Sequence, residues 1–231
     1  MVLAVLAVVG LVATERVGRA YAEDQIESRL RASGVSGDID VSVGSSWWRP
    51  TVLPALVTGD IDRVTVTVTD GSLLGLPVDD VHYTLGGLHG DVSLLGGTVV
   101  VRSLDGGTFE MRVPPEVIGD SLGIPVAVRN GRLVGGDERS PLEVRVQGDQ
   151  LVFSGPSLGE RSPQTLPVAD SYILPCRPAV SVEGGALRLA CTGDRVPGIL
   201  DAPLQGDEPV DVGPASPGQL PPPQTTAKPP G

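Results

Sequence analysis

A run of alternating residues limits the folds open to this chain. Residues 64–69 read Val-Thr-Val-Thr-Val-Thr, which places three valines on one side of an extended strand and three threonines on the other. The same two-residue period recurs in residues 81–85, 109–113, 142–146 and 187–189. Because each of these segments has one apolar and one polar face, the sequence predicts an antiparallel sheet with one face in water.

The composition agrees with a β-rich domain that has an aliphatic core. Hydrophobic residues make up 40% of the 231 residues, yet only 3% are aromatic, so Val, Leu, Ile and Ala must fill the interior. Pairs of glycines are spaced like the turns of a meander, at residues 86–87, 96–97, 106–107, 135–136 and 184–185. We therefore expect an α+β, β-rich fold, in which a twisted antiparallel meander is wrapped with an N-terminal helix and short helices.

The charge pattern excludes one large class of function. The chain has 17 Lys and Arg residues against 28 Asp and Glu, a formal net charge of −11. Nucleic-acid binding needs a clustered basic surface that meets the phosphate backbone. We therefore expect no nucleic-acid partner.

The first residues indicate export to a membrane. Residues 2–13 are uncharged and mainly aliphatic, as in the apolar part of a signal sequence. As a helix they would extend ~18 Å, less than the roughly 30 Å of a hydrocarbon core. Residues 20–22 read Ala-Tyr-Ala and match a signal-peptidase site, but they lie far beyond the apolar run. A signal or anchor segment over residues 1–21 is therefore expected, with an uncleaved anchor favoured over cleavage and over a buried core helix.

A helix is expected from an N-cap at Thr14 to Gly34, but its apolar residues do not form one stripe. At 100° per residue, Val17 and Tyr21 fall on one side. The apolar residues of the second half fall on another side, at Ala22, Ile26 and Leu30. We expect a change of surroundings near Ala22, where the helix passes from the membrane onto the domain.

The remaining chain divides into a domain and a tail. The period-two segments place a β-rich domain over residues 22–200. Within it, residues 54–57 and 114–118 carry prolines where short helices can start. Residues 201–231 are rich in proline and glycine and almost free of aliphatic spacing, which predicts a disordered tail.

Two cysteines flank a candidate hairpin over residues 179–189. If Glu183 and Gly184 form its two-residue turn, Cys176 lies opposite Cys191 and a cross-strand disulfide is within reach. If Gly184 and Gly185 form the turn, Cys176 lies opposite Gly193 instead. A disulfide between Cys176 and Cys191 is favoured over two buried thiols, because the N-terminus indicates an oxidising compartment.

Residues 119–123 read Gly-Asp-Ser-Leu-Gly and match the nucleophile motif of serine hydrolases. Such enzymes place their histidine after the serine, whereas both histidines of this chain precede Ser121. Prolines on both sides also oppose a strand–turn–helix elbow. The sequence therefore favours a helix C-terminal turn closed by Gly123, with no catalytic residue and no enzyme activity.

A second motif contains possible metal ligands. Asp80 and His82 are followed by His89 and Asp91, and a hairpin turn at residues 86–87 would bring the four together. The alternation that groups them also places them on the polar face, where such residues are expected in any case. We therefore expect no metal ion and no other cofactor.

The third motif is a loop with both tryptophans of the chain. Trp47 and Trp48 stand beside Arg49, just after a strand expected at residues 39–43. Tryptophan and arginine at an apolar edge suit a membrane interface, and the guanidinium can meet a phosphate. Alternatively, one tryptophan closes the end of the aliphatic core, and both roles can hold at once because neighbouring side chains point opposite ways.

The order of these features resembles the LmeA-type phospholipid-binding proteins of actinobacterial cell envelopes. The resemblance covers residues 22–200 and is most specific over residues 56–66, Leu-Val-Thr-Gly-Asp-Ile-Asp-Arg-Val-Thr-Val. It includes the aromatic and proline loop and Leu-Pro-Cys at residues 174–176. Many relatives have Gly-Phe-Pro-Phe where this chain has Ser-Trp-Trp-Arg-Pro at residues 46–50. Some relatives are lipoproteins, and this chain lacks the cysteine for that.

The resemblance implies a lipid-binding domain similar to the tubular lipid-binding proteins, on the extracytoplasmic face of the cell membrane, that acts without catalysis in envelope lipid or glycolipid maintenance. Its expected partners are phospholipid and the membrane. The candidate lipid-binding residues are Trp47, Trp48, Arg49, Leu53, Leu56, Val64, Val66, Val68, Tyr83, Phe109 and Met111. Sequence leaves open whether the apolar sheet face is a groove or a packed core, and the competing hypothesis is an envelope protein-interaction module without a lipid.

Overall fold

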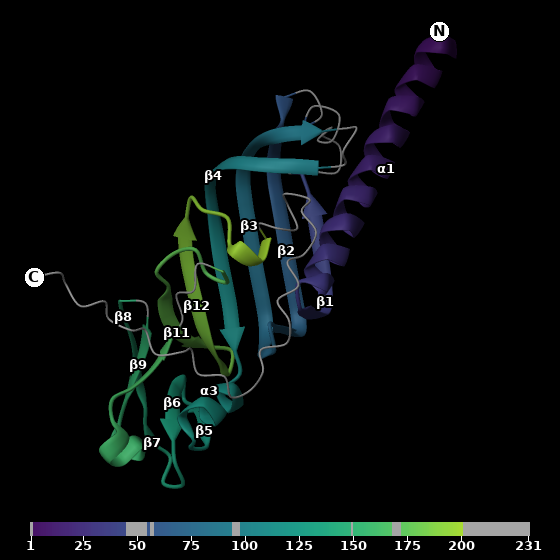
Figure 1. Ribbon diagram of the computed structural model, residues 1–231. Coiled ribbons are helices and arrows are strands. Elements are labelled where there is room, and N and C mark those ends of the chain that lie inside the picture. The colour runs from purple at the N-terminus through teal and green to yellow at the C-terminus, as the bar shows by residue number, and fades with distance from the viewer. Residues whose placement is uncertain are drawn as a thin grey trace, which may run out of the picture.

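The computed structural model describes residues 2–44, 55, 58–93, 98–148, 150–167 and 172–200 (Figure 1). A six-stranded antiparallel sheet dominates, with strands in the order β1-β2-β3-β4-β12-β11. Its strands are β1 Val35–Val43, β2 Asp60–Leu73, β3 Leu76–Ser93, β4 Thr98–Val113, β11 Ala179–Glu183 and β12 Ala186–Gly193. The expected α+β, β-rich fold with an antiparallel meander is confirmed.

Helix α1, Val2–Ala32, lies along β1 at one edge of this sheet and extends beyond it toward the N-terminus (Figure 1). Leu30 is buried and Ile26 packs against the core, whereas Val17 and Tyr21 are 70% and 65% exposed. The second half of the helix thus packs on the domain as expected, and the passage of the first half from a membrane stays a prediction. The Glu23 carboxylate accepts a hydrogen bond from the backbone N–H of Val43 (2.9 Å) and ties the helix to the end of β1.

The start of this helix differs from the prediction. We expected an N-cap at Thr14, but the helix runs without a break from Val2, so Thr14 is an interior residue. The preceding residues contain no proline, and Ala and Leu among them favour a helix. The helices of the described residues do not combine the length and apolar content needed to cross a membrane.

The glycine pairs do not all turn the chain. Gly184 and Gly185 form the β11–β12 turn with φ values of 60° and 88°, as expected of a tight hairpin. The pairs at 86–87 and 106–107 lie inside β3 and β4, where Gly86 pairs with Gly106. The prediction of turns at these two pairs was wrong, because β3 and β4 both continue through the glycines and pair with each other there. The pair at 96–97 lies outside the described residues.

Two smaller sheets follow at the far end of the molecule from the N-terminus (Figure 1). Helix α3, Pro115–Leu122, leads to the sheet β5-β6-β7, built from Val126–Arg129, Arg132–Gly135 and Ser140–Pro141. The sheet β10-β9-β8 is built from Glu143–Gln147 (β8), Gln150–Ser154 (β9) and Gln164–Pro167 (β10), with the 3₁₀ turn η1 at Pro156–Arg161. Buried residues of these sheets, such as Leu133 and Phe153, belong to the same hydrophobic cluster as the large sheet.

Candidate functional site

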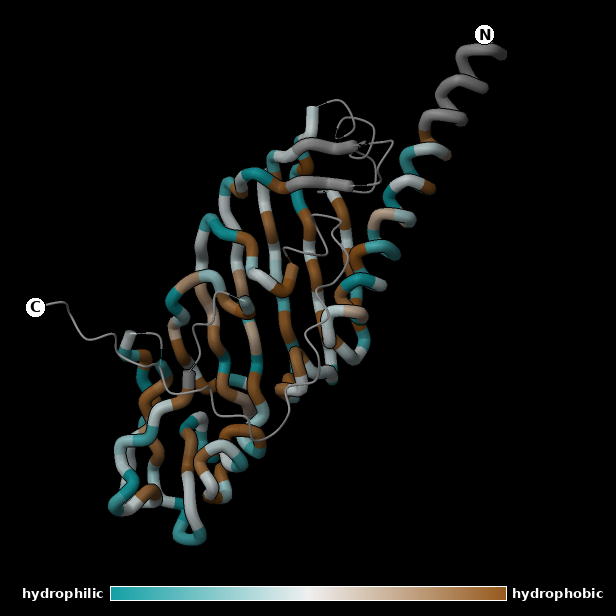
Figure 2. The backbone as a smooth tube through the Cα atoms, viewed as in Figure 1, coloured by the Kyte–Doolittle hydropathy of each residue, from teal (hydrophilic) through white to brown (hydrophobic). Residues whose placement is uncertain are grey.

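One face of the six-stranded sheet is apolar across its whole width, and we call it the inner face. The strand register aligns its side chains in rows that cross the strands. One row contains Val41, Val66, Tyr83, Phe109 and Cys191, and the next contains Ile39, Val68, Val81, Met111, Leu189 and Val180. Figure 2 shows the corresponding hydrophobic bands along the strands. The sheet therefore brings the predicted residues of β2, β3 and β4 to one surface.

The inner face is closed in this structure. The six sheet residues predicted to contact lipid are between 1% and 3% exposed: Val64, Val66, Val68, Tyr83, Phe109 and Met111. Tyr83 and Phe109 pack edge to face, with ring centroids 5.7 Å apart. The Phe109 ring also lies over Gly107, where an added Cβ would come within 2.7 Å of it. This close approach requires glycine at that position.

Two late segments cover the inner face, and we call residues 172–176 and 196–200 together the strap. The helical turn of the strap is visible in front of the sheet in Figure 1. The strap buries its own apolar side chains, with Leu174, Ile199 and Leu200 each 1% exposed. Its two segments are joined by the Ile199 N–H, which donates to the Tyr172 carbonyl (2.8 Å).

A buried tyrosine connects the strap to the sheet. The Tyr83 hydroxyl donates a hydrogen bond to the Ile173 carbonyl (3.0 Å). Burial raises the pKa of this hydroxyl, so it stays protonated and remains a donor. This hydrogen bond is a polar link between the strap and the centre of the inner face, and apolar packing joins the two surfaces around it.

A disulfide also fixes the strap. Cys176 and Cys191 are bonded, with their Cα atoms 5.9 Å apart, as predicted. The turn is formed by Gly184 and Gly185, which is the alternative that places Cys176 opposite Gly193. Cys176 does lie against Gly193, 3.2 Å from where a Cβ would stand, and reaches Cys191 diagonally because β11 begins only at Ala179. The bond can form because Cys176 precedes β11 and is not held in register by the β11–β12 ladder.

The family profile for LmeA-like phospholipid-binding proteins matches residues 13–220, most of the chain. The chain belongs to the LmeA-like family. No curated protein and no solved structure gave a match. Membership of this family supports phospholipid binding by the chain.

The candidate residues before β2 are not placed. Trp47, Trp48, Arg49, Leu53 and Leu56 lie outside the described residues. Ala55, between them, is described and is buried. The role of the tryptophan loop in this LmeA-like chain therefore stays a prediction.

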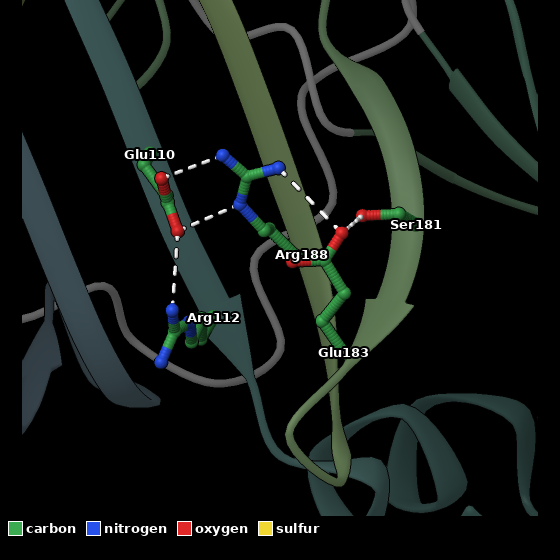
Figure 3. A network of polar contacts seen from close by, with 5 residues as sticks. All are labelled: Glu110, Arg112, Ser181, Glu183 and Arg188. Carbon is green, nitrogen blue, oxygen red and sulfur yellow. Dashed lines mark hydrogen bonds and ion pairs between the residues drawn. The ribbon is translucent and has the colours of Figure 1, made fainter. Parts of the chain in front are cut away.

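The opposite, outer face of the sheet is polar. Glu110 accepts two hydrogen bonds from Arg188, at 2.7 Å from Nε and 2.8 Å from Nη2, and Arg112 approaches the same carboxylate at 3.5 Å (Figure 3). Arg188 also approaches Glu183 at 3.8 Å, and Glu183 accepts from Ser181. The Arg188 hydrogen bonds lower the pKa of the Glu110 carboxyl below its ordinary value. Ion pairs within the sheet thus bring Glu110 together with Arg188 and Arg112.

The expected grouping of the two histidines was wrong. Because β3 continues through Gly86 and Gly87, His82 and His89 lie seven residues apart on one strand. His82 contacts the hydroxyls of Thr67 and Thr84 at 3.1 Å and 3.2 Å. The described residues contain no group of three His, Cys, Asp or Glu side chains that could hold a metal ion.

His89 instead lies between two carboxylates, those of Asp60 (2.8 Å) and Asp105 (3.1 Å). The hydrogen bond to Asp60, followed by the one to Asp105, raises the pKa of the His89 imidazole. All three side chains are exposed to water by more than two fifths, which limits the strength of these pairs.

Ser121 occupies the last turn of α3, as predicted. Its hydroxyl donates to the Val117 carbonyl (2.9 Å), and Gly123 closes the helix in the left-handed conformation with φ 66°. Pro115 stands in the first turn. Ser121 thus lies near the end of a short helix that begins at a proline. A nucleophile elbow instead requires a strand directly before the serine.

Sequence analysis missed the strap and the charged pairs of the outer face. The strap carried a signal in Ile173-Leu174 and Ile199-Leu200, two apolar dipeptides in short proline-containing segments without a period of two. The pairing of Glu110 with Arg188 depends on the contact between β4 and β12. That contact joins strands 78 residues apart, so no local pattern predicts it.

Proposed function

We propose that this chain is a membrane-anchored, extracytoplasmic phospholipid-binding protein that acts without catalysis in the maintenance of envelope lipids or glycolipids. The observation that carries the proposal is the six-strand-wide apolar inner face, in a chain of the phospholipid-binding family. In this proposal acyl chains lie on the inner face in place of the strap.

The exchange of strap for lipid is energetically feasible. Burying Leu174, Ile199 and Leu200 stabilises the closed state by roughly 5–9 kcal/mol in total, at about 1.5–3 kcal/mol for each side chain. An acyl chain of about a dozen methylenes recovers a similar free energy, at about 0.8 kcal/mol for each buried CH₂. One apolar cover can therefore replace the other at little net cost.

We place the mouth of this site at the tryptophan loop, with Arg49 available to meet a lipid phosphate. The exposed apolar residues Val12, Val17 and Tyr21 on α1 support a membrane at the N-terminal end, because they continue the apolar run of residues 2–13. A net charge of −11 gives no long-range attraction to an anionic bilayer. Binding should therefore depend weakly on salt.

The link between Tyr83 and the strap gives the first test. Tyr83→Phe removes the hydroxyl that holds Ile173 and should speed phospholipid uptake from vesicles about fivefold or more, since a hydrogen bond is worth about 1 kcal/mol. Ser121→Ala is the matched control, because it removes a hydroxyl that donates to a backbone carbonyl within α3. Uptake would be followed by transfer of a fluorescent phosphatidylcholine. Equal rates for all three proteins would show that the strap does not gate the inner face.

The loop gives the second test. Replacing Trp47 and Trp48 with alanine should reduce vesicle binding and uptake by the folded full chain, each Trp burying roughly 200 Å². Circular dichroism would check the fold of the variant. Undiminished uptake would place the mouth elsewhere.

The closed inner face also supports a second candidate function. A fully packed interior, with Val81 and Leu85 at 0% exposure, also suits a protein-interaction module that binds no lipid. Mass spectrometry of lipids that co-purify with the folded chain separates the two. We expect phospholipid at up to one molecule per chain, and its absence together with no uptake from vesicles would favour the module.

A further inference from the structure

The outer face contains a hollow of about 440 Å³ above β4, β12 and β11. Its floor is formed by Ala179 and Ala190, which are paired across β11 and β12. Glu110 continues the same row on β4. Because two alanines stand where larger side chains occupy the neighbouring rows, the surface is indented at this point.

The walls of the hollow are rich in hydrogen-bond donors. Arg188 bounds one side, Arg177 lies at the sheet edge, and the other lining side chains with polar groups are His82, Thr108, Glu110 and Thr192. Both ring nitrogens of His82 already contact threonine hydroxyls of β2 and β3. Thr108 and Thr192 are register partners in β4 and β12, and both line the hollow.

The two arginines of the hollow differ in their partners. Arg188 is neutralised by Glu110 and Glu183 (Figure 3). Arg177 donates to the Val146 carbonyl (3.2 Å), and the described residues offer it no carboxylate. The lining therefore holds two guanidinium groups and one carboxylate, and that carboxylate is already bound by Arg188 and Arg112.

The position of Arg177 is fixed by its neighbours. It directly follows Cys176, which is bonded to Cys191 of β12, and it precedes the start of β11. The disulfide thus anchors the backbone next to Arg177, and the hydrogen bond to the Val146 carbonyl orients its guanidinium. A fixed, unneutralised guanidinium beside hydroxyl groups is an arrangement that binds oxyanions.

We propose that this hollow binds a small phosphate-type oxyanion, with Arg177 as its main contact and the hydroxyls of Thr108 and Thr192 as further donors. The site lies on the face opposite the apolar inner face, so it does not depend on the proposed lipid function. The net charge of −11 repels anions at a distance, so affinity comes from local contacts. A phosphate group of this kind occurs on free phosphorylated metabolites and on phospholipid headgroups.

The test is a titration of the ¹⁵N-labelled full chain with inorganic phosphate, with glycerol 3-phosphate and with dihexanoyl phosphatidic acid below its micelle concentration. We expect saturable shifts of the backbone amides of Ala179, Ala190 and Thr192. Arg177→Gln should weaken binding about tenfold, the loss of one charge-assisted hydrogen bond. Arg195→Gln is the matched control, because this arginine is exposed and does not line the hollow. Arg177→Lys keeps the charge and should lose less than Arg177→Gln.

The ligands distinguish the two sources of phosphate. Equal binding of all three would assign the hollow to free phosphate groups, and much tighter binding of dihexanoyl phosphatidic acid, still dependent on Arg177, would assign it to a headgroup. Binding that is unchanged in Arg177→Gln, or no saturable shift with any of the three, would overturn the proposal. Because it leaves the inner face untouched, Arg177→Gln should take up vesicle lipid like the wild type, which separates this site from the proposed function.

Discussion

The two faces of the six-stranded sheet differ in how they are completed. On β4, Phe109 is 1% exposed on the inner face, whereas its neighbour Glu110 forms ion pairs at the surface of the outer face. The outer face pairs many of its polar groups with one another, as in the contacts of Glu110 with Arg188 and of His82 with Thr67. The inner face consists of apolar side chains, so another apolar surface must cover it to keep them out of water. The same strand thus contributes to a polar outer face that can lie in water and to an apolar inner face that must be covered.

The strap is that cover in this structure. The Tyr83 hydroxyl and the Cys176–Cys191 bond link it to the sheet, and its buried side chains pack against the apolar face. Apolar packing is not directional, so an acyl chain can take the place of Leu174 or Ile199. In the proposed function, this difference between the faces lets one sheet have a fixed polar surface and an apolar surface whose cover can be exchanged.

The largest predicted effect comes from the inner face. Phe109→Ala should lower the free energy of unfolding by about 3–5 kcal/mol, because it leaves a cavity against Tyr83 and exposes Gly107. Thr108→Ala, one residue earlier and exposed, should cost less than about 0.5 kcal/mol. Urea unfolding followed by circular dichroism measures both. Similar costs for the two variants would contradict the assignment of the faces.

The disulfide should have the next largest effect. Replacing Cys176 and Cys191 with serine opens a loop whose ends are 15 residues apart and should cost about 3 kcal/mol on the chain-entropy model. It should also increase hydrogen exchange in the strap more than in β2 and β3. Thiol labelling of the unreduced, unfolded wild type should find no free cysteine; quantitative labelling of both would show that the bond is absent in the protein.

The smallest effect is expected on the outer face and depends on pH. Arg188 lowers the pKa of Glu110 in the folded state below its ordinary 4.5, so the folded form holds this proton less tightly than the unfolded chain. The stabilisation is therefore complete above about pH 5 and is lost as the pH falls through the folded pKa. Glu110→Gln should cost about 1 kcal/mol at neutral pH, and the difference from wild type should shrink toward about pH 3. A difference that stays constant over this range would mean that the ion pair contributes nothing.

Sequence reasoning predicted the inner face well and its cover poorly. The alternation of Val64, Val66 and Val68 predicts that these residues share a face, because side chains in a strand alternate between its two faces whatever the distant contacts are. The glycines at 86–87 were read as a turn, since glycine alone does not distinguish a hairpin from two long facing strands; the decision depends on the pairing of Gly86 with Gly106.

The candidate site was predictable only in part. The spacing of Tyr83, Phe109 and Met111 placed them on the apolar face of the sheet, and the positions of the two cysteines beside the hairpin predicted the disulfide. The strap was not, because residues 172–176 and 196–200 have no regular period and are placed by the tertiary contact between Ile173 and Tyr83. The hollow of the outer face depends on rows that cross β4, β12 and β11, which only the assembled sheet defines.

The central claim is that phospholipid acyl chains occupy the inner face in place of the strap. Its most direct test is photocrosslinking of the full chain with a phospholipid that carries a diazirine in its acyl chain, followed by peptide mass spectrometry. We expect crosslinks on inner-face residues such as Met111 and Leu189 and on the strap residue Leu174. Crosslinks confined to the outer face or to α1, with the inner face unmodified, would contradict the account.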